Sequence, residues 1–220
     1  MLKGAYFNSA RTLRWYLYRI WDESKPLVMF IGLNPSKADE EDNDPTITRV
    51  CSIAKHNGYG GVYMVNCFSH ISTDSAGLIV NRLTSAFNNY IITEISRKCK
   101  DVVFAWGSSN NIVNETNRVK ELSIQFPKAK VLFINKDGNP KHPLYCAIES
   151  ELIPYSSYVQ HMLLKHRDYT PNCGKDWCVV GGGPTRWDES KKQFKCHCGW
   201  CSNYDKEFIK LYIQKTTVLL

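Results

Sequence analysis

Four apolar segments of the chain end in polar residues that could contact a ligand. The run PLVMF leads into IGLNPSKADEEDNDPTI, residues 31–47, where a Gly-x-Asn-Pro step ends the strand and presents Asn34. Further apolar runs are followed by Asn66, Ser108 and His142. Amide, hydroxyl and imidazole groups donate and accept hydrogen bonds, so they can bind polar ligands and orient water. If these residues meet in the fold, they form one binding or hydrolytic site.

The segments that carry these residues alternate between strand and helix patterns. Strands are expected at 26–33, 61–68, 101–107 and 129–135, and helices at 44–60, 75–99 and 114–126. This alternation predicts an α/β fold, a three-layer sandwich around a mostly parallel four-stranded sheet. Residues 6–22, which are aromatic and basic, fit an opening strand or a short helix. Ligands of such sheets bind beyond the carboxyl ends of the strands, so the polar residues are expected to share one cleft.

The four strand ends resemble the conserved blocks of the uracil-DNA glycosylase superfamily. In order, the segments are VMFIGLNPS, VYMVNCF, VVFAWGSSN and VLFINKDGNPKHPLY, and the resemblance depends on their order and spacing. The first segment is similar to the version found in the mismatch-specific and single-strand-selective branches. The chain also resembles a bacterial and phage family that shares LNPS, DPT and HPLY motifs. Together these resemblances cover roughly residues 15–155.

The resemblance implies hydrolysis of an N-glycosidic bond. The sugar becomes cation-like as the base leaves, so the enzyme must hold a water molecule and stabilise the departing anionic base. Asn34 corresponds to the asparagine that orients the water, and His142 to the histidine that donates a hydrogen bond to a base oxygen. Asp39 and Asp44 are close enough in sequence to act as an auxiliary base, but Asp44 also fits the N-cap of the following helix. His142 could likewise be a turn residue that caps backbone groups.

Three residues are expected to hold the base. Asn66 corresponds to the asparagine that reads the base edge, and its amide offers one donor face and one acceptor face. Phe68 is a candidate for stacking on a flipped base, and Leu33 is a candidate for a contact beside Asn34. The alternatives are that Asn66 satisfies backbone groups at the strand end and that Phe68 belongs to the core.

Contacts to DNA are expected from polar residues around the same strand ends. The serines after AWG offer hydroxyl and backbone N–H groups to a phosphate, or they form a polar turn. Tyr145 belongs to a Leu-Tyr pair that stands where the glycosylase superfamily often has Ser-Pro, so this chain departs from the pattern there. The candidate DNA-binding residues are Ser36, Ser108, Ser109, Lys141 and Tyr145.

The last quarter of the chain carries a separate signal that is rich in cysteine. The strand and helix alternation fades after ELIPY, which divides the chain into an α/β domain, 1–165, and a small Cys-rich appendage, 166–220. The segments NCGKDWC and CHCGWC supply four thiolates for a structural zinc ion, with an iron–sulfur cluster or free thiols as the alternatives. The expected ligands are Cys173, Cys178, Cys198 and Cys201, with Cys196 or His197 as a substitute.

Composition predicts a cytoplasmic protein, and its charge permits a nucleic-acid partner. The chain has 220 residues, 43% of them hydrophobic, which is enough to bury a sizeable core. No apolar stretch reaches the roughly 18 residues of a membrane span, and the first residues lack the apolar centre of a signal peptide. The formal net charge of +7 suits a polyanionic partner, although it equally fits a slightly basic protein without one. We expect a monomer.

The residues and the resemblance together predict a monofunctional DNA glycosylase. It would flip a nucleotide out of single- or double-stranded DNA and release the base without a cofactor or a covalent lysine intermediate. Because the related family occurs in bacteria and phages, a modified base of phage DNA is a candidate substrate, which suggests a role in phage defence. The alternatives are a non-catalytic nucleic-acid-binding module with a zinc ribbon and a nucleoside or nucleotide hydrolase.

Overall fold

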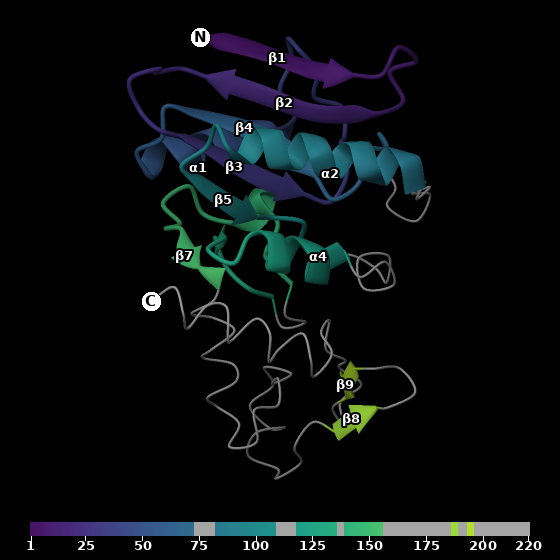
Figure 1. Ribbon diagram of the computed structural model, residues 1–220. Helices are drawn as coiled ribbons and strands as arrows, with labels where there is room; N and C mark the ends of the chain where they lie inside the picture. Colours follow the sequence, from purple (N-terminus) through teal and green to yellow (C-terminus); the bar gives the residue numbers. More distant parts are fainter. Residues whose placement is uncertain (73–81, 109–117, 136–138, 156–185, 189–192, 196–220) are drawn as a thin grey trace.

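The residues that the structure describes form a seven-stranded mixed sheet with helices packed against it (Figure 1). This computed structural model describes residues 1–72, 82–108, 118–135, 139–155, 186–188 and 193–195. The strands of the sheet are β1 (Leu2–Phe7), β2 (Arg14–Ile20), β3 (Leu27–Gly32), β4 (Gly61–Asn66), β5 (Asp101–Phe104), β6 (Lys130–Val131) and β7 (Ile153–Pro154). The helices are α1 (Pro45–His56), α2 (Arg82–Ser96), α4 (Arg118–Gln125) and the short 3₁₀ helix η2 (Pro143–Tyr145).

The strand order of the sheet is β1-β2-β4-β3-β5-β6-β7. The central strands β4, β3, β5 and β6 pair in parallel, and they correspond to the four strands expected from the sequence. The outer strands pair antiparallel, β1 with β2, β2 with β4, and β6 with β7. The carboxyl ends of the parallel strands therefore lie at the same edge as the amino end of β2.

The expected four-stranded, mostly parallel sheet is wrong, because three more strands extend it on both sides. Residues 6–22, which fit a strand or a helix equally well, supply the end of β1 and all of β2. Alternating burial along RWYLYRI is the pattern of a sheet strand, but seven residues are too few to decide the period from sequence. Pairing with β1 and with β4 settles the conformation, and the sequence does not reveal those partners.

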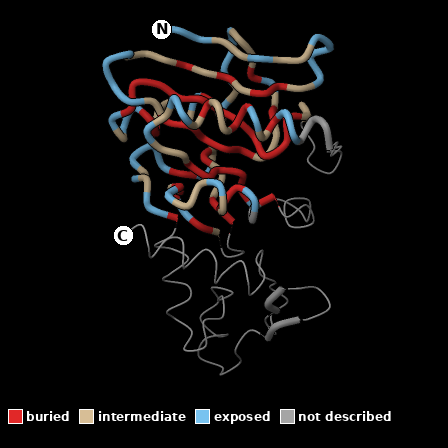
Figure 2. The backbone as a smooth tube through the Cα atoms, in the orientation of Figure 1, coloured by how far each residue is buried: buried red, intermediate tan, exposed pale blue. Residues whose placement is uncertain are grey.

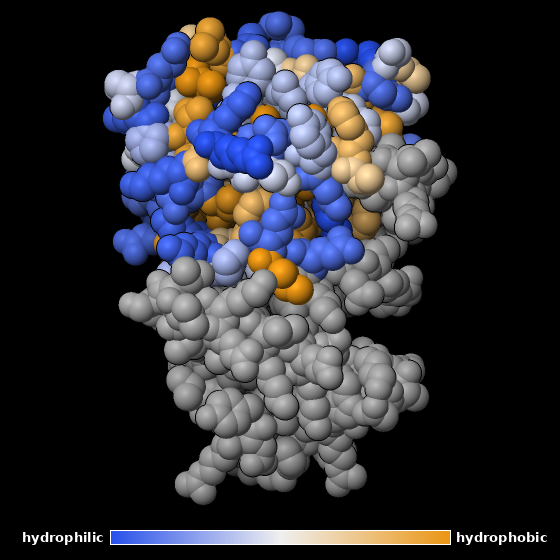
Figure 3. Space-filling model, in the orientation of Figure 1, coloured by the Kyte–Doolittle hydropathy of each residue, from blue (hydrophilic) through white to orange (hydrophobic). Residues whose placement is uncertain are grey.

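Successive residues of the central strands point to opposite faces of the sheet and form two cores. Val28 and Phe30 of β3 pack on one face with the buried residues of α1, whereas Met29 and Ile31 pack on the other face. That second face is covered by α2 and α4 (Figure 1). Figure 2 shows the most continuous burial along these central strands. On the face drawn in Figure 3, hydrophilic residues cover most of the described surface and hydrophobic residues show between them.

Helix α1 begins at the Asp44-Pro45 step that the sequence indicates, and it ends at His56, before the end of the expected range 44–60. The N-cap is Asp44, whose carboxylate accepts a hydrogen bond from the Ile47 N–H, and Pro45 takes the first helical position. Its last turn is followed by Asn57 and then by Gly58, which has a φ of 80°. The helix therefore points its N-terminal turn toward the carboxyl ends of the parallel strands, beside the loop that leaves β3.

Outside this sheet, the described residues include a short hairpin of β8 (Arg186–Asp188) and β9 (Gln193–Lys195). Most of the Cys-rich appendage expected at 166–220 lies outside the described residues. No helix within the described part of the chain has both the length and the apolar character needed to cross a membrane.

Candidate functional site

A cavity of about 260 Å³ lies at the carboxyl ends of the parallel strands. Its wall includes the last residues of β3 and β4, the segment after β5, the first turn of α1 and the loop before η2. Ligand pockets typically begin at roughly 300 Å³, so this cavity suits a single small guest. The lining residues are Arg14, Gly32, Leu33, Asn34, Ser36, Asp44, Thr46, Ile47, Met64, Asn66, Ser72, Trp106 and His142.

The side chain of Asn34 is held in one orientation by neighbouring backbone. Its Nδ2 donates hydrogen bonds to the carbonyl oxygens of Ser72 at 2.6 Å and Pro35 at 3.2 Å. Among the described residues, no donor contacts its Oδ1. Because the amide nitrogen is engaged with the protein, the oxygen is the group that can accept a hydrogen bond from a guest or a water molecule.

Asn66 is the clearest sign that the cavity receives a ligand. The residue is only 1% exposed, and neither Nδ2 nor Oδ1 of its side chain has a hydrogen-bond partner among the described residues. Leaving buried polar groups unpaired costs about 1–3 kcal/mol each, so proteins rarely do it without a reason. A guest with one donor and one acceptor would satisfy both ends of this amide.

Gly32 leaves room for the side-chain amide of Asn66, and Asn88 holds the backbone of Asn66. A Cβ added to Gly32 would lie 2.8 Å from Asn66 Oδ1 and 2.5 Å from the terminal methyl carbon of Met64, so only glycine leaves room for this arrangement. On the other side, Asn88 Nδ2 donates to the carbonyl oxygens of Asn66 at 2.9 Å and Cys67 at 3.2 Å. The protein therefore fixes the backbone of this strand end and leaves the amide unpaired.

His142 presents a neutral imidazole to the cavity. Its Nδ1 accepts a hydrogen bond from the Leu144 N–H at 3.4 Å, which places the proton of the neutral ring on Nε2. Burial lowers the pKa of His142 below its ordinary value, and the nearby carboxylate of Asp44 opposes that shift. Gly107 packs closely against the ring, since a Cβ there would lie 3.0 Å from the Cβ of His142. The available group is therefore an N–H donor.

Asp44 combines a capping role with a position on the cavity wall. Its Oδ1 accepts the Ile47 N–H at 2.8 Å, which confirms the N-cap expected from the sequence. Asp44 also lines the cavity. Its negative charge opposes the lowering of the His142 and Arg14 pKa values by burial. Asp44 is therefore close enough to interact electrostatically with both His142 and Arg14.

Arg14 brings a buried positive charge to the same cavity. The residue is 2% exposed, and its Nη1 donates to the Ala38 carbonyl oxygen at 2.6 Å. Its Nε has no acceptor among the described residues. Burial lowers the pKa of Arg14 to about 10, while Asp44 acts in the opposite direction. The guanidinium therefore remains charged at neutral pH.

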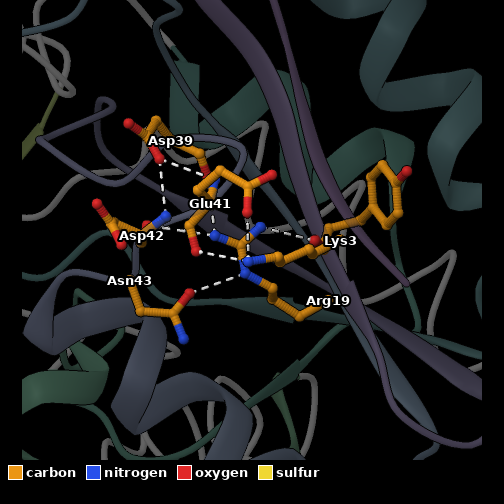
Figure 4. Close-up of polar contacts among 7 residues, drawn as sticks. Lys3, Arg19, Asp39, Glu41, Asp42 and Asn43 are labelled. Atoms are coloured by element: carbon orange, nitrogen blue, oxygen red, sulfur yellow. Dashed lines mark hydrogen bonds and ion pairs between the residues drawn. The ribbon is translucent and has the colours of Figure 1, made fainter. Parts of the chain in front are cut away.

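A second buried arginine, Arg19, fixes the acidic loop between β3 and α1 (Figure 4). Its Nε donates to Asn43 Oδ1 at 2.8 Å, and its Nη2 donates to the carbonyl oxygens of Asp39 at 2.8 Å and Asp42 at 3.2 Å. The carboxylate of Asp39 accepts the N–H groups of Glu41 and Asp42, so it closes a turn and does not line the cavity. The loop therefore delivers Asp44 to the cavity in a defined position.

Residues 14–144 match the family described as a protein of unknown function, DUF1643. The chain belongs to this family. The DUF1643 match contains every lining residue of the cavity, from Arg14 to His142. No curated protein and no solved structure matches the chain.

Within the DUF1643 region, the structure brings most of the predicted catalytic and base-binding residues to one cavity. Its wall contains Asn34, Asp44, Asn66 and His142. Leu33 and Ser36 line the same space. Phe68 does not, because it is 6% exposed and packs in the core beneath α2 and α4. The apolar wall is formed instead by Leu33, Ile47, Met64 and Trp106.

The other predicted DNA-binding residues of the DUF1643 region lie outside the cavity wall. Ser108 is exposed and accepts a hydrogen bond from Asn135 Nδ2 at 2.8 Å. Lys141 places its ammonium 5.4 Å from the ring centroid of Phe133. Tyr145 is 71% exposed, and its ring lies 5.9 Å from the ring of His142. Ser109 lies outside the described residues.

The predicted metal site falls outside both the DUF1643 match and the described residues. That applies to all of its candidate ligands, Cys173, Cys178, Cys196, His197, Cys198 and Cys201. Within the described ranges, no group of three or more His, Cys, Asp or Glu side chains could hold a metal ion. The four cysteines there, Cys51, Cys67, Cys99 and Cys146, form no disulfides.

Arg14 and Thr46 are among the lining residues that reasoning from the sequence missed, together with Gly32, Ile47, Met64, Ser72 and Trp106. Thr46 could have been found, because it directly follows the Asp44-Pro45 helix start that points at the site. Arg14 could not, since its place depends on the antiparallel pairing of β2 with β4. That pairing puts the amino end of β2 beside the carboxyl end of β4, and with it the arginine beside the cavity.

Proposed function

We propose that this DUF1643 protein binds a nucleobase in the cavity and hydrolyses its N-glycosidic bond, excising a base flipped out of DNA. One observation carries the proposal: Asn34, Asn66 and His142, which are far apart in the chain, line the same small cavity. The resemblance of their segments to the strand ends of the uracil-DNA glycosylase superfamily supports the same interpretation.

In the proposed reaction, water attacks the sugar while the base leaves as an anion. The water oxygen forms a bond to C1′, the C1′–N bond breaks, and its electron pair departs with the base, which solvent then protonates. Oδ1 of Asn34 accepts a hydrogen bond from the water and orients it. The carboxylate of Asp44 takes up the proton that the water releases.

His142 stabilises the leaving base in this scheme. Its Nε2–H donates to a base oxygen, and this hydrogen bond strengthens as negative charge develops there. A neutral imidazole suits this role, which agrees with the lowered pKa of His142 and with the Leu144 N–H bound to Nδ1. The ring starts neutral and needs no proton transfer of its own.

Asn66 selects the base by its edge. An amide with an unpaired donor and an unpaired acceptor matches a base edge with a carbonyl oxygen next to an N–H. Leu33 and Trp106 supply apolar wall for the flat faces of the ring. Phe68 has no part in this scheme, because it is buried in the core.

Contact with DNA is proposed for residues at the surface near the cavity. Tyr145 is exposed beside His142, where an aromatic ring could stack on a base next to the flipped nucleotide. Ser36, Ser108 and Lys141 are polar or basic and follow the same strand ends. Their role is to position phosphates rather than to read sequence.

An assay for abasic sites tests the proposal. Oligonucleotides that each carry one modified base, single- or double-stranded, are incubated with the full chain and then treated with alkali, which cleaves at abasic sites. We expect the wild-type protein to release at least one such base. Asn34→Ala and His142→Ala should each slow release by about 10²–10³-fold, the usual effect of removing one group that stabilises the transition state.

His56→Ala is the matched control, because His56 is exposed at the end of α1 and does not line the cavity. It should release the base at the wild-type rate. Equal release by Asn34→Ala would remove Asn34 from its role. The absence of abasic sites with every base, in either strand state, would contradict excision from DNA.

A free nucleoside or nucleotide is the second candidate substrate. The cavity volume of about 260 Å³ suits one small guest, so it fits a free nucleoside or nucleotide as well as a flipped base. Chromatography of reactions with free nucleosides separates the two. Release of base from nucleosides but not from DNA assigns this activity. Binding of DNA without release, unchanged in Asn34→Ala, assigns a non-catalytic module.

For the Cys-rich appendage we propose a structural zinc ion held by Cys173, Cys178, Cys198 and Cys201, with an iron–sulfur cluster as the alternative. Two pairs of cysteines separated by a spacer are typical of such sites. The ultraviolet and visible spectrum of the purified protein separates the two, since a cluster absorbs visible light and zinc does not.

A further inference from the structure

The cavity holds a buried positive charge that the proposed hydrolysis does not use. Arg14 lines the cavity and is 2% exposed, and among the described residues its side chain donates one hydrogen bond, from Nη1 to the Ala38 carbonyl oxygen. Its Nε points at no acceptor among the described residues. Buried charges are normally paired and fully hydrogen-bonded, because an unpaired one is strongly destabilising.

The first turn of α1 contributes positive potential to the same cavity. Thr46 and Ile47 line the wall there. The Ile47 N–H donates to Asp44 Oδ1 and the Thr48 N–H to the Asp44 carbonyl oxygen, so the Thr46 N–H is the first-turn donor without a partner among the described residues. The unpaired N–H groups of a helix N-terminus carry a partial positive charge and favour anions. The helix has twelve residues, and its N-terminus is therefore a full helix end rather than an isolated turn.

Asp44 does not neutralise Arg14 directly. The two interact electrostatically, but no ion pair between them occurs among the described residues. The Oδ1 of Asp44 already accepts the Ile47 N–H at the helix N-terminus. Among the described residues the guanidinium therefore has no direct counter-ion, and a ligand oxygen could supply one.

We propose that Arg14 and the first turn of α1 form an anion subsite, which binds a negatively charged oxygen of the ligand. A guanidinium suits this role because its N–H groups match the geometry of phosphate and carboxylate oxygens. The inference rests on the proposed function only in taking the ligand to be a nucleobase derivative. The anion is then either the phosphate of a nucleotide or a carboxylate on the base.

Isothermal titration calorimetry of the full chain tests the subsite with two matched pairs of ligands. Pseudouridine and its 5′-monophosphate differ by the phosphate, and their C–C glycosidic bond excludes hydrolysis during the titration. Uracil and 6-carboxyuracil differ by a carboxylate on the ring. In at least one pair we expect the anionic member to bind about tenfold tighter or more, and the pair that responds identifies the source of the charge.

Arg14→Gln should reduce that preference to within about twofold, because glutamine keeps a donor but carries no charge. Arg11→Gln is the matched control: Arg11 is exposed in the same hairpin, pairs with Glu40 and does not line the cavity. It should keep the wild-type preference. Circular dichroism spectra establish whether each variant is folded.

Equal affinity within both pairs for the wild-type protein, including no detectable binding of any of the four ligands, overturns the subsite. Retention of the preference by folded Arg14→Gln also overturns it. If Arg14→Gln does not fold, competition decides: inorganic phosphate should weaken binding of the anionic ligand and not of the neutral one. A preference for the anion without release of bases from DNA would reject the glycosylase and leave the subsite standing.

Discussion

At the scale of residues, two buried asparagines at the end of β4 have opposite hydrogen bonding, Asn66 on the cavity wall and Asn88 outside it. Asn88 donates its amide hydrogens to the carbonyl oxygens of Asn66 and Cys67, so it stabilises the end of β4. The amide of Asn66 has no partner among the described residues. One asparagine therefore serves the fold, and the other is kept available at the expense of stability.

Replacing Asn66 should stabilise the protein. In Asn66→Leu we expect the free energy of unfolding to rise by about 1 kcal/mol, because an unpaired buried amide gives way to an apolar group of similar shape. In Asn88→Leu we expect it to fall by about 1–3 kcal/mol, because the Asn66 carbonyl oxygen loses this donor and the Cys67 carbonyl oxygen keeps only the one from Arg118 Nε. Urea denaturation measures both. A large loss of stability in Asn66→Leu would indicate that its amide supports the fold.

His142 should make stability depend on pH. Burial lowers its folded pKa below the ordinary value of 6.5, so above pH 6.5 the ring is neutral in both states and its contribution is complete. As the pH falls below 6.5, the unfolded state takes up the proton first, and stability is lost until the folded pKa is reached. Urea denaturation at a series of pH values should show a smaller loss for His142→Gln, and equal losses would contradict the shift.

At the scale of elements, α1 and the loop before it act as one positioning unit. Arg19 holds the loop through the backbone of Asp39 and Asp42, and the loop ends at the cap of the helix. The cap residue, Asp44, therefore stands where a carboxylate can both accept the Ile47 N–H and face the cavity. Its two roles can be separated by substitution.

Asp44→Ala should lower the free energy of unfolding by about 1 kcal/mol, because the N-cap acceptor is lost. Asp44→Asn should keep nearly all of the stability, since asparagine caps helices as well as aspartate does. If Asp44 is the auxiliary base, release of the base should nevertheless slow in Asp44→Asn. Denaturation and the abasic-site assay measure the two effects, and full activity in Asp44→Asn would leave Asp44 with the capping role alone.

At the scale of the whole molecule, the cavity depends on strands of opposite direction. The parallel strands β3, β4 and β5 bring their polar ends to one edge of the sheet. The antiparallel strand β2 brings its first residue, Arg14, to the same edge. A sheet of parallel strands alone would present the amides and the imidazole without the buried cation.

Metal removal should affect the appendage and spare the sheet. The described residues contain no group of three or more possible metal ligands, and the proposed zinc ligands all lie at 173–201. We expect about one zinc ion per chain in purified protein, which a chelator removes without shifting the main unfolding transition. Elemental analysis and differential scanning calorimetry measure the two. Loss of the main transition on chelation would show that the metal supports the whole fold.

The sequence by itself determined the central strands, the start of α1 and the polar residues at the strand ends. These features are local: apolar runs, the Asp44-Pro45 helix start and the Asn34-Pro35 strand end are each readable within a few residues. Alternation of strands and helices then predicts parallel pairing, whose carboxyl ends share one edge, and the cavity lies at that edge.

Only the tertiary structure decided the outer strands, the place of Arg14 and the burial of Phe68. Each depends on a partner distant in the chain: β2 on its pairing with β4, and Phe68 on the core under α2 and α4. Short segments fit more than one conformation, because the free energy that selects one comes from packing and pairing rather than from local preference. The tertiary structure therefore places the buried Arg14 in the site and places Phe68, the expected stacking residue, in the core.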